Sequence, residues 1–275
     1  MSTKKYIYAT IVAFIRTVIL ETMIRRLYRI ILLIATNVLA FVLFTPLWMM
    51  LRPVRPLQQS MVDSAVRLWA RLICSILGIR VICKGDVITD KGRFIVSNHL
   101  SYIDIPVLAS LFNCVFVSKK EVRRWPIIGT LSALVGTVFV DRNSKASIIN
   151  ALTDAKRALL VNKCVVLFPE ATTSNGKEIR PFKSSFFALP ERLKIPIQPV
   201  AISYFDHDAW EKSEYVPWHG DMNILSHMWK ITGLRGIRTV VTLCEIIKPN
   251  DSLSRKDLAL IAEKGIKEAY FRDEP

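Results

Sequence analysis

The sequence lacks paired cysteines and several short motifs that define large enzyme classes. Its five cysteines are an odd number, and no two form a Cys-x-x-Cys pair. This argues against a disulfide scaffold and a structural zinc site, and favours a reducing compartment. There is also no Gly-x-Ser-x-Gly elbow, no P-loop, no Gly-x-Gly-x-x-Gly turn and no His-Glu-x-x-His helix. These absences disfavour elbow-type serine hydrolases, P-loop nucleotide hydrolases, dinucleotide enzymes and zinc proteases.

Acidic residues are scarce relative to basic ones. The 275 residues include 38 lysines and arginines against 23 acids, which gives a net charge of +15. Such a surplus favours a polyanionic partner, which can be a nucleic acid, an anionic membrane or a phosphorylated substrate. Hydrophobic residues make up 51% of the chain, too large a share for an intrinsically disordered protein.

Much of the charge and of the apolar excess lies near the N-terminus. Residues 1–60 contain eight basic side chains and one acidic one, a net charge of +7. Residues 30–51 form a run of 22 residues without a charge. As a helix this run would be about 33 Å long, enough to cross a bilayer core of roughly 30 Å. A second apolar stretch, residues 6–20, is shorter and interrupted by Arg16. No small-residue cleavage site follows it, so a cleavable signal peptide is not expected.

Basic residues between the two apolar stretches bear on their arrangement. A hairpin of two spans would put Arg25, Arg26 and Arg29 on the far side of the membrane, against the positive-inside rule. A helix pair lying in one leaflet, with these arginines reaching anionic head groups, satisfies the rule better. Pro46 is a candidate break in the second helix. The alternative is a buried helix of a soluble protein. We therefore predict membrane-anchoring helices over residues 1–56.

Residues 57–275 alternate β-rich runs with amphipathic stretches, which predicts one α/β domain. A helix is expected over residues 58–77, ended by Gly78, with a buried stripe of Met61, Ala65, Leu68, Leu72 and Ile76. Strands are expected at residues 79–83, 93–97, 115–118, 137–140, 165–168, 197–203 and 239–246. Further helices are expected at residues 103–112, 127–135, 145–160, 221–231 and 255–270. This order favours a mixed, largely parallel sheet flanked by helices.

The first segment with chemical potential is residues 96–104, where a predicted strand runs into His99. Asp104 follows five positions later. A carboxylate can hold the tautomer of an imidazole and stabilise the imidazolium that forms when the histidine takes a proton. On one continuous helix the two side chains would lie roughly 140° apart. They meet if His99 lies in the turn before a helix that carries Asp104, and Ser101 is a candidate N-cap for that helix. The spacing alone fits equally well a histidine that only closes a strand.

Three other segments place polar residues or prolines at strand ends. Glu170 follows the strand at 165–168 and opens a turn of small residues, whose N–H groups and hydroxyls can hold phosphate or oxyanion oxygens. Arg142 follows the strand at 137–140, and its planar guanidinium suits a phosphate. Residues 195–202 have two prolines at a strand entrance. Taken alone, each of these is better explained as an ordinary strand end.

Together and in this order, the four segments resemble the glycerolipid acyltransferase family, over roughly residues 60–250. The family's NHxSxxD motif is matched by Asn98, His99, Ser101 and Asp104. Its GxxFxxR motif is matched by Gly136, Phe139 and Arg142. Its FPEGTRS motif is matched at Phe168, Pro169, Glu170, Thr172 and Ser174, and its proline-containing strand at residues 195–202.

This resemblance implies a membrane-bound O-acyltransferase. A fatty acyl chain would pass from acyl-CoA or acyl-carrier protein, each a donor substrate and not a bound cofactor, to the free hydroxyl of a lysolipid. No metal, nucleic acid or acyl-enzyme would be involved. His99 would be the general base and Asp104 its orienting partner. The residues expected to bind substrate are Asn98, Ser101, Lys119, Arg142, Glu170, Ala171, Thr172 and Thr173. The expected location is the cytoplasmic face of a membrane, in the first instance the bacterial inner membrane.

Two departures from the family pattern bear on the acceptor. Ala171 stands where the family usually has glycine, and Thr173 where lysophosphatidate enzymes commonly have arginine. The lead expectation is acylation of 1-acylglycerol-3-phosphate to phosphatidate. Because the lost arginine removes a phosphate contact, a head-group-capped lysophospholipid or a lyso-ornithine lipid is the alternative acceptor. Two alternatives come from other classes: a non-catalytic lipid-binding protein, and a membrane-anchored nucleic-acid-binding protein that lacks a recognisable binding motif.

Three further histidines, His207, His219 and His227, show no metal-ligand spacing. They are expected to be structural or exposed.

Overall fold

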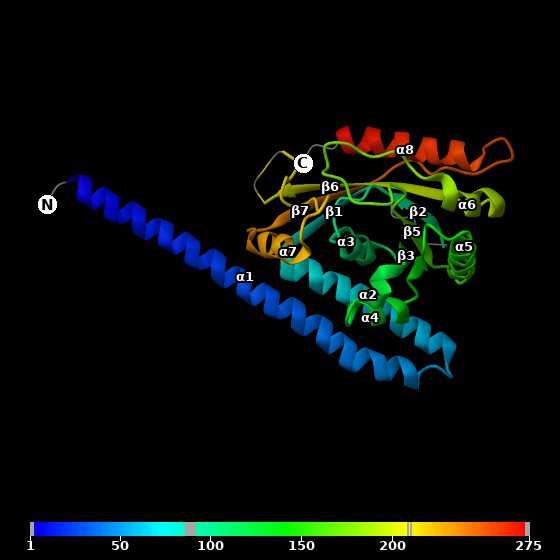
Figure 1. Ribbon diagram of the computed structural model, residues 1–275, viewed down its shortest axis with the longest axis horizontal. Coiled ribbons are helices and arrows are strands. Elements are labelled where there is room, and N and C mark those ends of the chain that lie inside the picture. The colour runs from blue at the N-terminus through cyan, green and yellow to red at the C-terminus, as the bar shows by residue number, and fades with distance from the viewer. Residues whose placement is uncertain (1–2, 86–91, 208, 210, 273–275) are drawn as a thin grey trace.

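The computed structural model describes residues 3–85, 92–207, 209 and 211–272. Its centre is a seven-stranded sheet in the order β1-β7-β6-β2-β5-β3-β4 (Figure 1). Neighbouring strands are parallel except for β6 and β7, which are antiparallel. The strands are β1 (Ile79–Lys84), β2 (Phe94–Ser97), β3 (Cys114–Lys119), β4 (Val138–Val140), β5 (Cys164–Leu167), β6 (Ile197–Asp206) and β7 (Ile237–Leu243). Each corresponds to a run expected from the sequence, so the mixed, largely parallel sheet is confirmed.

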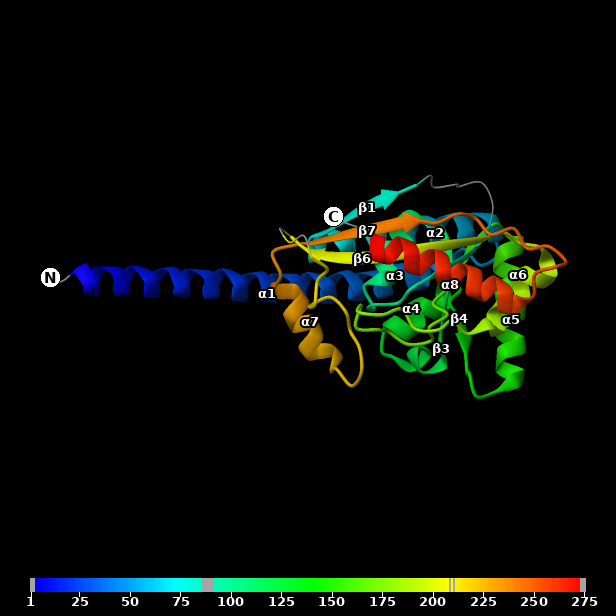
Figure 2. The ribbon, with the colours of Figure 1, turned by 90° about the horizontal axis from the view of Figure 1, so that it is seen from above.

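Helices cover both faces of the sheet. They are α1 (Thr3–Met50), α2 (Arg55–Leu77), α3 (Asp104–Leu111), α4 (Ile128–Leu134), α5 (Lys145–Leu160), α6 (Ala188–Leu193), α7 (Ile224–Gly233) and α8 (Arg255–Arg272). Helix α8 lies on one face, whereas α3 and α2 lie on the other, with α1 outside α2 (Figures 1 and 2). Strand residues buried from both sides, such as Phe94, Ile95 and Val96, are uniformly apolar, as expected for a covered parallel sheet. Helix α6 and the 3-10 turns at Lys120–Arg124 and Ser184–Phe187 fall where no element is expected from the sequence.

Helix α1 is one continuous element of 48 residues, about 72 Å long. The expected pair of N-terminal helices is therefore wrong, and Pro46 lies inside the helix. A proline removes one helical hydrogen bond, yet the helix continues through Pro46 to Met50. The chain turns instead at residues 51–54, beside Pro53, because a residue before proline is driven out of helical geometry. The proposed division of the chain at residue 56 lies close to this turn and stays a proposal.

The arginines in the middle of α1 contact protein. Arg29 is 4% exposed, and its Nη1 donates to the carbonyl oxygens of Thr232, at 3.2 Å, and Leu234, at 2.6 Å. Arg25 donates to the carbonyl of Gly233 at 3.1 Å, and the Arg26 guanidinium lies 5.0 Å from the ring centroid of Trp229. The last carbonyls of a helix are unpaired and carry partial negative charge. Arg25 and Arg29 therefore cap the C-terminal end of α7. All three arginines contact protein, whereas the sequence predicts that they face head groups.

The buried face of α2 is turned by one residue from the expected stripe. Leu68 and Leu72 are 60% and 43% exposed. The buried residues are Gln58, Val62, Ala70, Ile73, Cys74 and Leu77. One residue corresponds to roughly 100° of rotation on a helix. Two apolar stripes on the same helix satisfy helical periodicity equally, so the sequence pattern alone could not choose between them. The expected C-terminal stop is confirmed, because Gly78 has φ of 69° and caps the helix.

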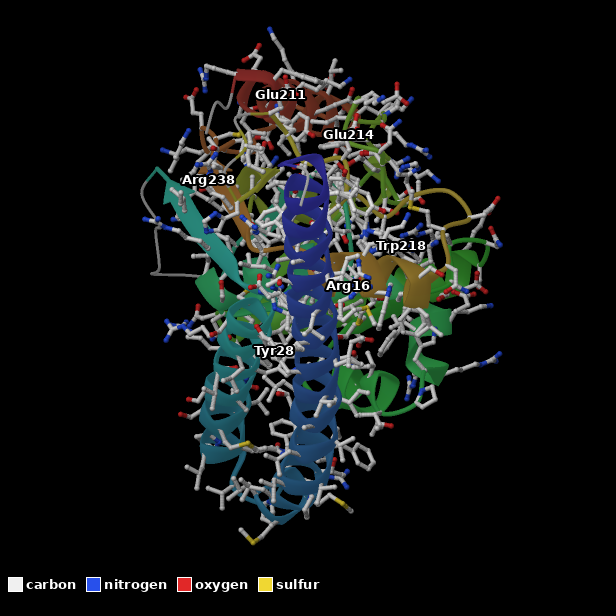
Figure 3. All side chains as sticks on the ribbon, turned by 90° about the vertical axis from the view of Figure 1, so that its left-hand side faces the viewer. Arg16, Tyr28, Glu211, Glu214, Trp218 and Arg238 are labelled. Carbon is white, nitrogen blue, oxygen red and sulfur yellow. The ribbon has the colours of Figure 1, made fainter. Side chains whose placement is uncertain are left out.

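The N-terminal part of α1 projects beyond the α/β body (Figure 1). Figure 3 views the molecule from that end, with Arg16 and Tyr28 on α1 and Trp218 on the loop before α7. The segment Ala13–Met50 has a mean hydropathy of 2.4 in its most apolar window, of which 11% is buried. Long and apolar enough to cross a membrane, this helix suggests membrane association.

Candidate functional site

His99 and Asp104 meet at the carboxyl end of β2. His99 lies in the turn between β2 and α3, and Asp104 is the first residue of α3. The His99 Nδ1 and Asp104 Oδ2 atoms are 2.7 Å apart. Asp104 is fully buried, whereas 19% of the His99 side chain is exposed. With Nδ1 held by the carboxylate, Nε2 is the ring nitrogen left for a proton from another molecule.

Asp104 is enclosed by hydrogen-bond donors. Its Oδ2 also accepts from the backbone N–H groups of Leu100, at 2.8 Å, and Ser101, at 3.0 Å. Its Oδ1 accepts from the hydroxyl of Tyr204 on β6 at 2.7 Å. The expected N-cap role of Ser101 is wrong, because Ile103 precedes α3 and no side chain caps the helix. Instead, the Asp104 carboxylate gathers the N–H groups of the turn before it, and the buried Ser101 Oγ has no partner among the described residues.

The loop after β5 fastens the turn that carries His99. Phe168 stacks on the His99 ring, with the ring centroids 4.0 Å apart. Glu170, 4% exposed, accepts from the His99 N–H at 2.7 Å through Oε1 and from the Arg180 N–H at 2.9 Å through Oε2. Burial raises the pKa of Glu170, and these two hydrogen bonds act in the opposite direction. Glu170 thus links two loops that are far apart in the sequence.

Arg142 and Ala171 come together on the exposed side of this loop. The Arg142 guanidinium donates to the carbonyl oxygen of Ala171, and burial lowers the pKa of Arg142. Ala171 has φ of 65°, the left-handed region that glycine adopts easily and other residues rarely do. The alanine at this position therefore adopts a backbone conformation in which glycine would be unstrained.

Of the other expected binding residues, all described in the structure, Thr172, Thr173 and Asn98 lie near His99, whereas Lys119 does not contact it. Thr172 is half-buried and Thr173 is 9% exposed, both in the loop beside His99. Asn98 is fully buried, and its side-chain amide bonds both the N–H and the carbonyl of Ile202 on β6, at 2.8 and 3.0 Å. Lys119 is exposed at the end of β3, where it pairs with Val140 in register. Within the described residues, no contact joins Lys119 to His99.

A comparison with protein families matches a model described as Acyltransferase over residues 79–203. The lyso-ornithine lipid O-acyltransferase of Pseudomonas aeruginosa is 35% identical, over 79% of this chain and 81% of that protein. Its counterpart in Rhizobium meliloti is 31% identical, over 80% and 77%. The 1-acyl-sn-glycerol-3-phosphate acyltransferase of Neisseria gonorrhoeae is 27% identical, over 66% and 71%.

This chain belongs to the glycerolipid acyltransferase family. It is an O-acyltransferase that uses lysolipids as acceptors. The crystal structure of the 1-acyl-sn-glycerophosphate acyltransferase of Thermotoga maritima has the same fold, with a TM-score of 0.70 over 91% of this chain and 96% of that one. Identity between the two is 18%, so this likeness concerns the fold alone.

A loop and helix α7 cover the turn that carries the histidine of the acyltransferase. The backbone N–H of Trp218 donates to the Leu100 carbonyl at 2.7 Å. The hydroxyl of Tyr102 lies 3.0 Å from His227 Nδ1, and His227 Nε2 lies 3.1 Å from the Tyr215 carbonyl. Because a carbonyl only accepts, Nε2 carries the hydrogen, and in the neutral ring Nδ1 then accepts from the Tyr102 hydroxyl. His227 is therefore a structural residue, as expected, and burial lowers its pKa, which favours the neutral ring.

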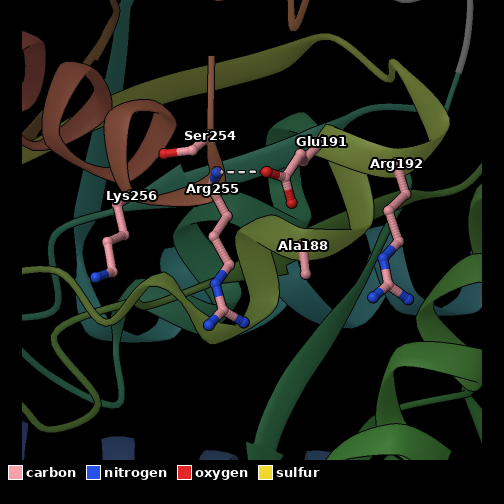
Figure 4. A pocket seen from close by; sticks show the side chains of 6 residues that line it. All are labelled: Ala188, Glu191, Arg192, Ser254, Arg255 and Lys256. Carbon is pink, nitrogen blue, oxygen red and sulfur yellow. Dashed lines mark hydrogen bonds between the residues drawn. The ribbon is translucent and has the colours of Figure 1, made fainter. Parts of the chain in front are cut away.

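A surface hollow of about 400 Å³ lies elsewhere on the acyltransferase (Figure 4). It is lined by Ala188, Glu191, Arg192, Ser254, Arg255 and Lys256. These residues belong to α6, which precedes the start of β6, and to the beginning of α8. His99 and Glu170 instead follow the carboxyl ends of β2 and β5. The hollow is thus at the other end of the sheet from the histidine.

Sequence reasoning missed the partners that hold the acyltransferase site together. Tyr204 lies one residue beyond the expected end of its strand. Its hydroxyl, at the end of a buried strand, was the available signal. Tyr270 on α8 donates to the Gly176 carbonyl at 2.7 Å and thereby secures the far end of the Glu170 loop. Nothing local in the sequence connects Tyr270 to that loop.

Proposed function

We propose that this acyltransferase moves a fatty acyl chain from a thioester donor to the free hydroxyl of a lyso-ornithine lipid. The choice of acceptor rests on the similarity to two lyso-ornithine lipid O-acyltransferases, which are 35% and 31% identical over about four fifths of this chain. The comparisons favour this acceptor over lysophosphatidate, our lead expectation from the sequence. The buried, uncharged Thr173 supports the same choice, because that position offers no cation to a phosphomonoester.

The geometry around His99 supports a general-base mechanism. Its Nε2 would take the proton of the acceptor hydroxyl as the oxygen forms a bond to the thioester carbonyl carbon. The imidazolium that results is stabilised by Asp104, 2.7 Å from Nδ1. When the tetrahedral intermediate collapses, the carbon–sulfur bond breaks and the thiolate takes the proton back from His99. Every proton is accounted for, and no acyl-enzyme is required.

The loop after β5 would stabilise the negative charge of that intermediate. The N–H groups of Thr172 and Thr173 have no acceptor within the described part of the chain, so they remain available for an oxyanion. Arg142, anchored on the Ala171 carbonyl, supplies a cation at the same loop. Asn98 and Glu170, which bond only backbone groups, would position the site from behind. Ser101 would contribute its N–H to Asp104, and the exposed Lys119 would contact anionic parts of either substrate.

The location we propose is the cytoplasmic face of a membrane, held there by α1. A lysolipid and a long acyl chain both partition into bilayers, so a catalyst seated on one meets its acceptor at high concentration. The basic surplus of the chain suits anionic lipid and the acidic donors acyl-CoA and acyl-carrier protein.

An acceptor panel tests this function. Purified protein receives acyl-CoA or acyl-carrier protein together with lyso-ornithine lipid, lysophosphatidate, lysophosphatidylethanolamine or lysophosphatidylglycerol. We expect kcat/KM for lyso-ornithine lipid to exceed that for lysophosphatidate by about tenfold or more, the factor that one lost charged contact provides. Thr173→Arg should narrow this ratio. A higher kcat/KM with lysophosphatidate in the unaltered protein would contradict the proposed acceptor.

His99→Ala tests the chemistry with any acceptor. We expect kcat to fall by about 10²–10⁴-fold, the usual contribution of a general base. His207→Ala is the matched control, because His207 lies away from the turn of His99. It follows the end of β6, seven residues beyond Val200, which pairs with Ser97 at the end of β2. It should keep its activity. Full activity of His99→Ala would remove His99 as the base.

A further inference from the structure

Tyr204 reaches the Asp104 carboxylate from outside the motif that carries the histidine. It lies on β6, whose Val200 pairs with Ser97 of β2. Its ring is 1% exposed, and its hydroxyl is 2.7 Å from Asp104 Oδ1. Two residues earlier on the same strand, the backbone of Ile202 is held on both sides by Asn98. The strand is therefore fixed against the turn, and the hydroxyl has a defined position.

The two oxygens of Asp104 have separate partners. Oδ2 faces His99 Nδ1 and two backbone N–H groups, whereas Oδ1 faces Tyr204 as its side-chain donor. The hydroxyl of Tyr204 therefore controls two properties of the carboxylate. It prevents rotation that would exchange the oxygens, and it takes up part of the negative charge that attracts the proton on His99.

Few other titratable groups surround this pair. Cys74 of α2 faces Tyr204, and burial raises the pKa of this thiol to about 12. Tyr270 of α8 faces Asp104 and Glu170, and its pKa is raised by burial. Glu170, on the loop after β5, faces both His99 and Asp104. Burial, with Asp104 beside it, also raises the pKa of Tyr204. The phenol therefore stays protonated at neutral pH and acts only as a donor.

We propose that Tyr204 is a positioning residue that sets the basicity of His99 through Asp104. The inference rests on the proposed function in one respect, that His99 acts as the base. Without the phenol hydroxyl, Asp104 keeps its negative charge and shares it with one donor fewer. It then holds the proton on His99 Nδ1 more strongly, and the pKa of His99 rises.

Two measurements on Tyr204→Phe test this. The first follows the ring carbons of isotopically labelled histidine by NMR as the pH is changed. We expect the pKa of His99 to rise by about 0.5–1 unit. The second is the pH profile of kcat/KM, whose acid limb should move up by the same amount because the base must be deprotonated. At the optimum, kcat should fall by about tenfold with KM changed by less than about twofold.

A graded substitution separates tuning from folding. Fluorotyrosine at position 204 keeps the shape of the ring and is a stronger donor, so it should move the pKa of His99 below that of the unaltered protein. Tyr215→Phe is the control, because it removes a phenol that is 56% exposed on the loop before α7, outside the contacts of Asp104. It should leave the pKa of His99 unchanged.

The outcomes are distinct. An unchanged pKa of His99 in Tyr204→Phe, or shifts of the same sign from phenylalanine and fluorotyrosine, would overturn the role of Tyr204. The titration does not depend on turnover. If no acceptor in the panel is acylated, the proposed function fails while the titration still decides the role of Tyr204.

Discussion

At the scale of single residues, Ala171 holds a left-handed backbone in the loop that fastens the turn of His99. Its φ is 65°, a conformation that costs an L-residue about 1–2 kcal/mol relative to the right-handed one. The conformation brings its carbonyl to Arg142, so the strain accompanies a contact at the site. Such strain persists only where the surrounding structure over-determines the backbone.

We predict that Ala171→Gly raises the free energy of unfolding by about 1 kcal/mol, because glycine adopts this backbone without strain. Thermal unfolding in detergent micelles measures the change. Ala146→Gly is the control, since Ala146 is exposed within helix α5. It should lower stability by about 1 kcal/mol, the ordinary cost of glycine in a helix. Destabilisation by both substitutions would contradict the left-handed assignment.

The contact between His99 and Asp104 could be anticipated because both residues lie within one short segment. The condition set by helical geometry, with the histidine in a turn before the helix, is met. The capping role of Ser101 was wrong because α3 begins only at Asp104, and the Asp104 N–H donates to the backbone carbonyl of Ser101 and not to its hydroxyl. Tyr204 is 100 residues from Asp104 in the chain, so its role depends on strand order. The sequence could not supply that order.

At the scale of elements, α7 is joined to the turn of His99 through His227. In its neutral form the imidazole accepts from Tyr102 and donates to the Tyr215 carbonyl. Burial lowers the pKa of His227 from its ordinary value of 6.5. As the pH falls below 6.5, His227 binds a proton in the unfolded chain before it does so in the folded chain.

We therefore predict that the part of stability contributed by His227 is present above pH 6.5 and is lost as the pH falls toward its folded pKa. The slope from this single group is at most about 1.4 kcal/mol per pH unit. Urea unfolding between pH 7.5 and 5.5 measures the dependence. In His227→Gln, which cannot be protonated, the same plot should be flatter. Identical slopes for both proteins would show that His227 does not titrate in this way.

The hydrophobic pattern of the sequence predicted the strands better than the helices. Each central strand is an apolar run bounded by turn residues, and both its faces are buried, so its location does not depend on orientation. Helix α2 has one buried face, and choosing it required knowledge of α1 and α3 as neighbours. The continuity of α1 was hidden by its arginines, whose partners on α7 lie about 200 residues away.

At the scale of the whole molecule, the exposed apolar surface is concentrated on α1. Leu39 and Leu43 are 58% and 59% exposed on the part of α1 that packs along the body. We predict that Leu39→Glu/Leu43→Glu abolishes co-sedimentation with anionic vesicles, because each charge costs several kcal/mol within a bilayer core. The loss of affinity should be about a hundredfold or more.

The control for this prediction uses equally exposed apolar residues elsewhere. Ile149 and Leu160 on α5 are 63% and 71% exposed. Ile149→Glu/Leu160→Glu should sediment with vesicles like the unaltered protein. Equal loss in both double variants would point to a general effect of charge, and retention in both would exclude α1 as the anchor.

The arginine contacts between α1 and α7 have a consequence for how substrate arrives. An enzyme on a slack tether samples many heights above a surface, and its local concentration falls with tether length. Here α1 is fixed to the α/β body near its middle, where Arg25 and Arg29 bind the end of α7, and again where it packs along α2. With α1 held by a membrane as we propose, the histidine would keep one fixed position relative to the bilayer. The acceptor would then have to reach the histidine by lateral diffusion within the membrane, because the site could not move out to meet it.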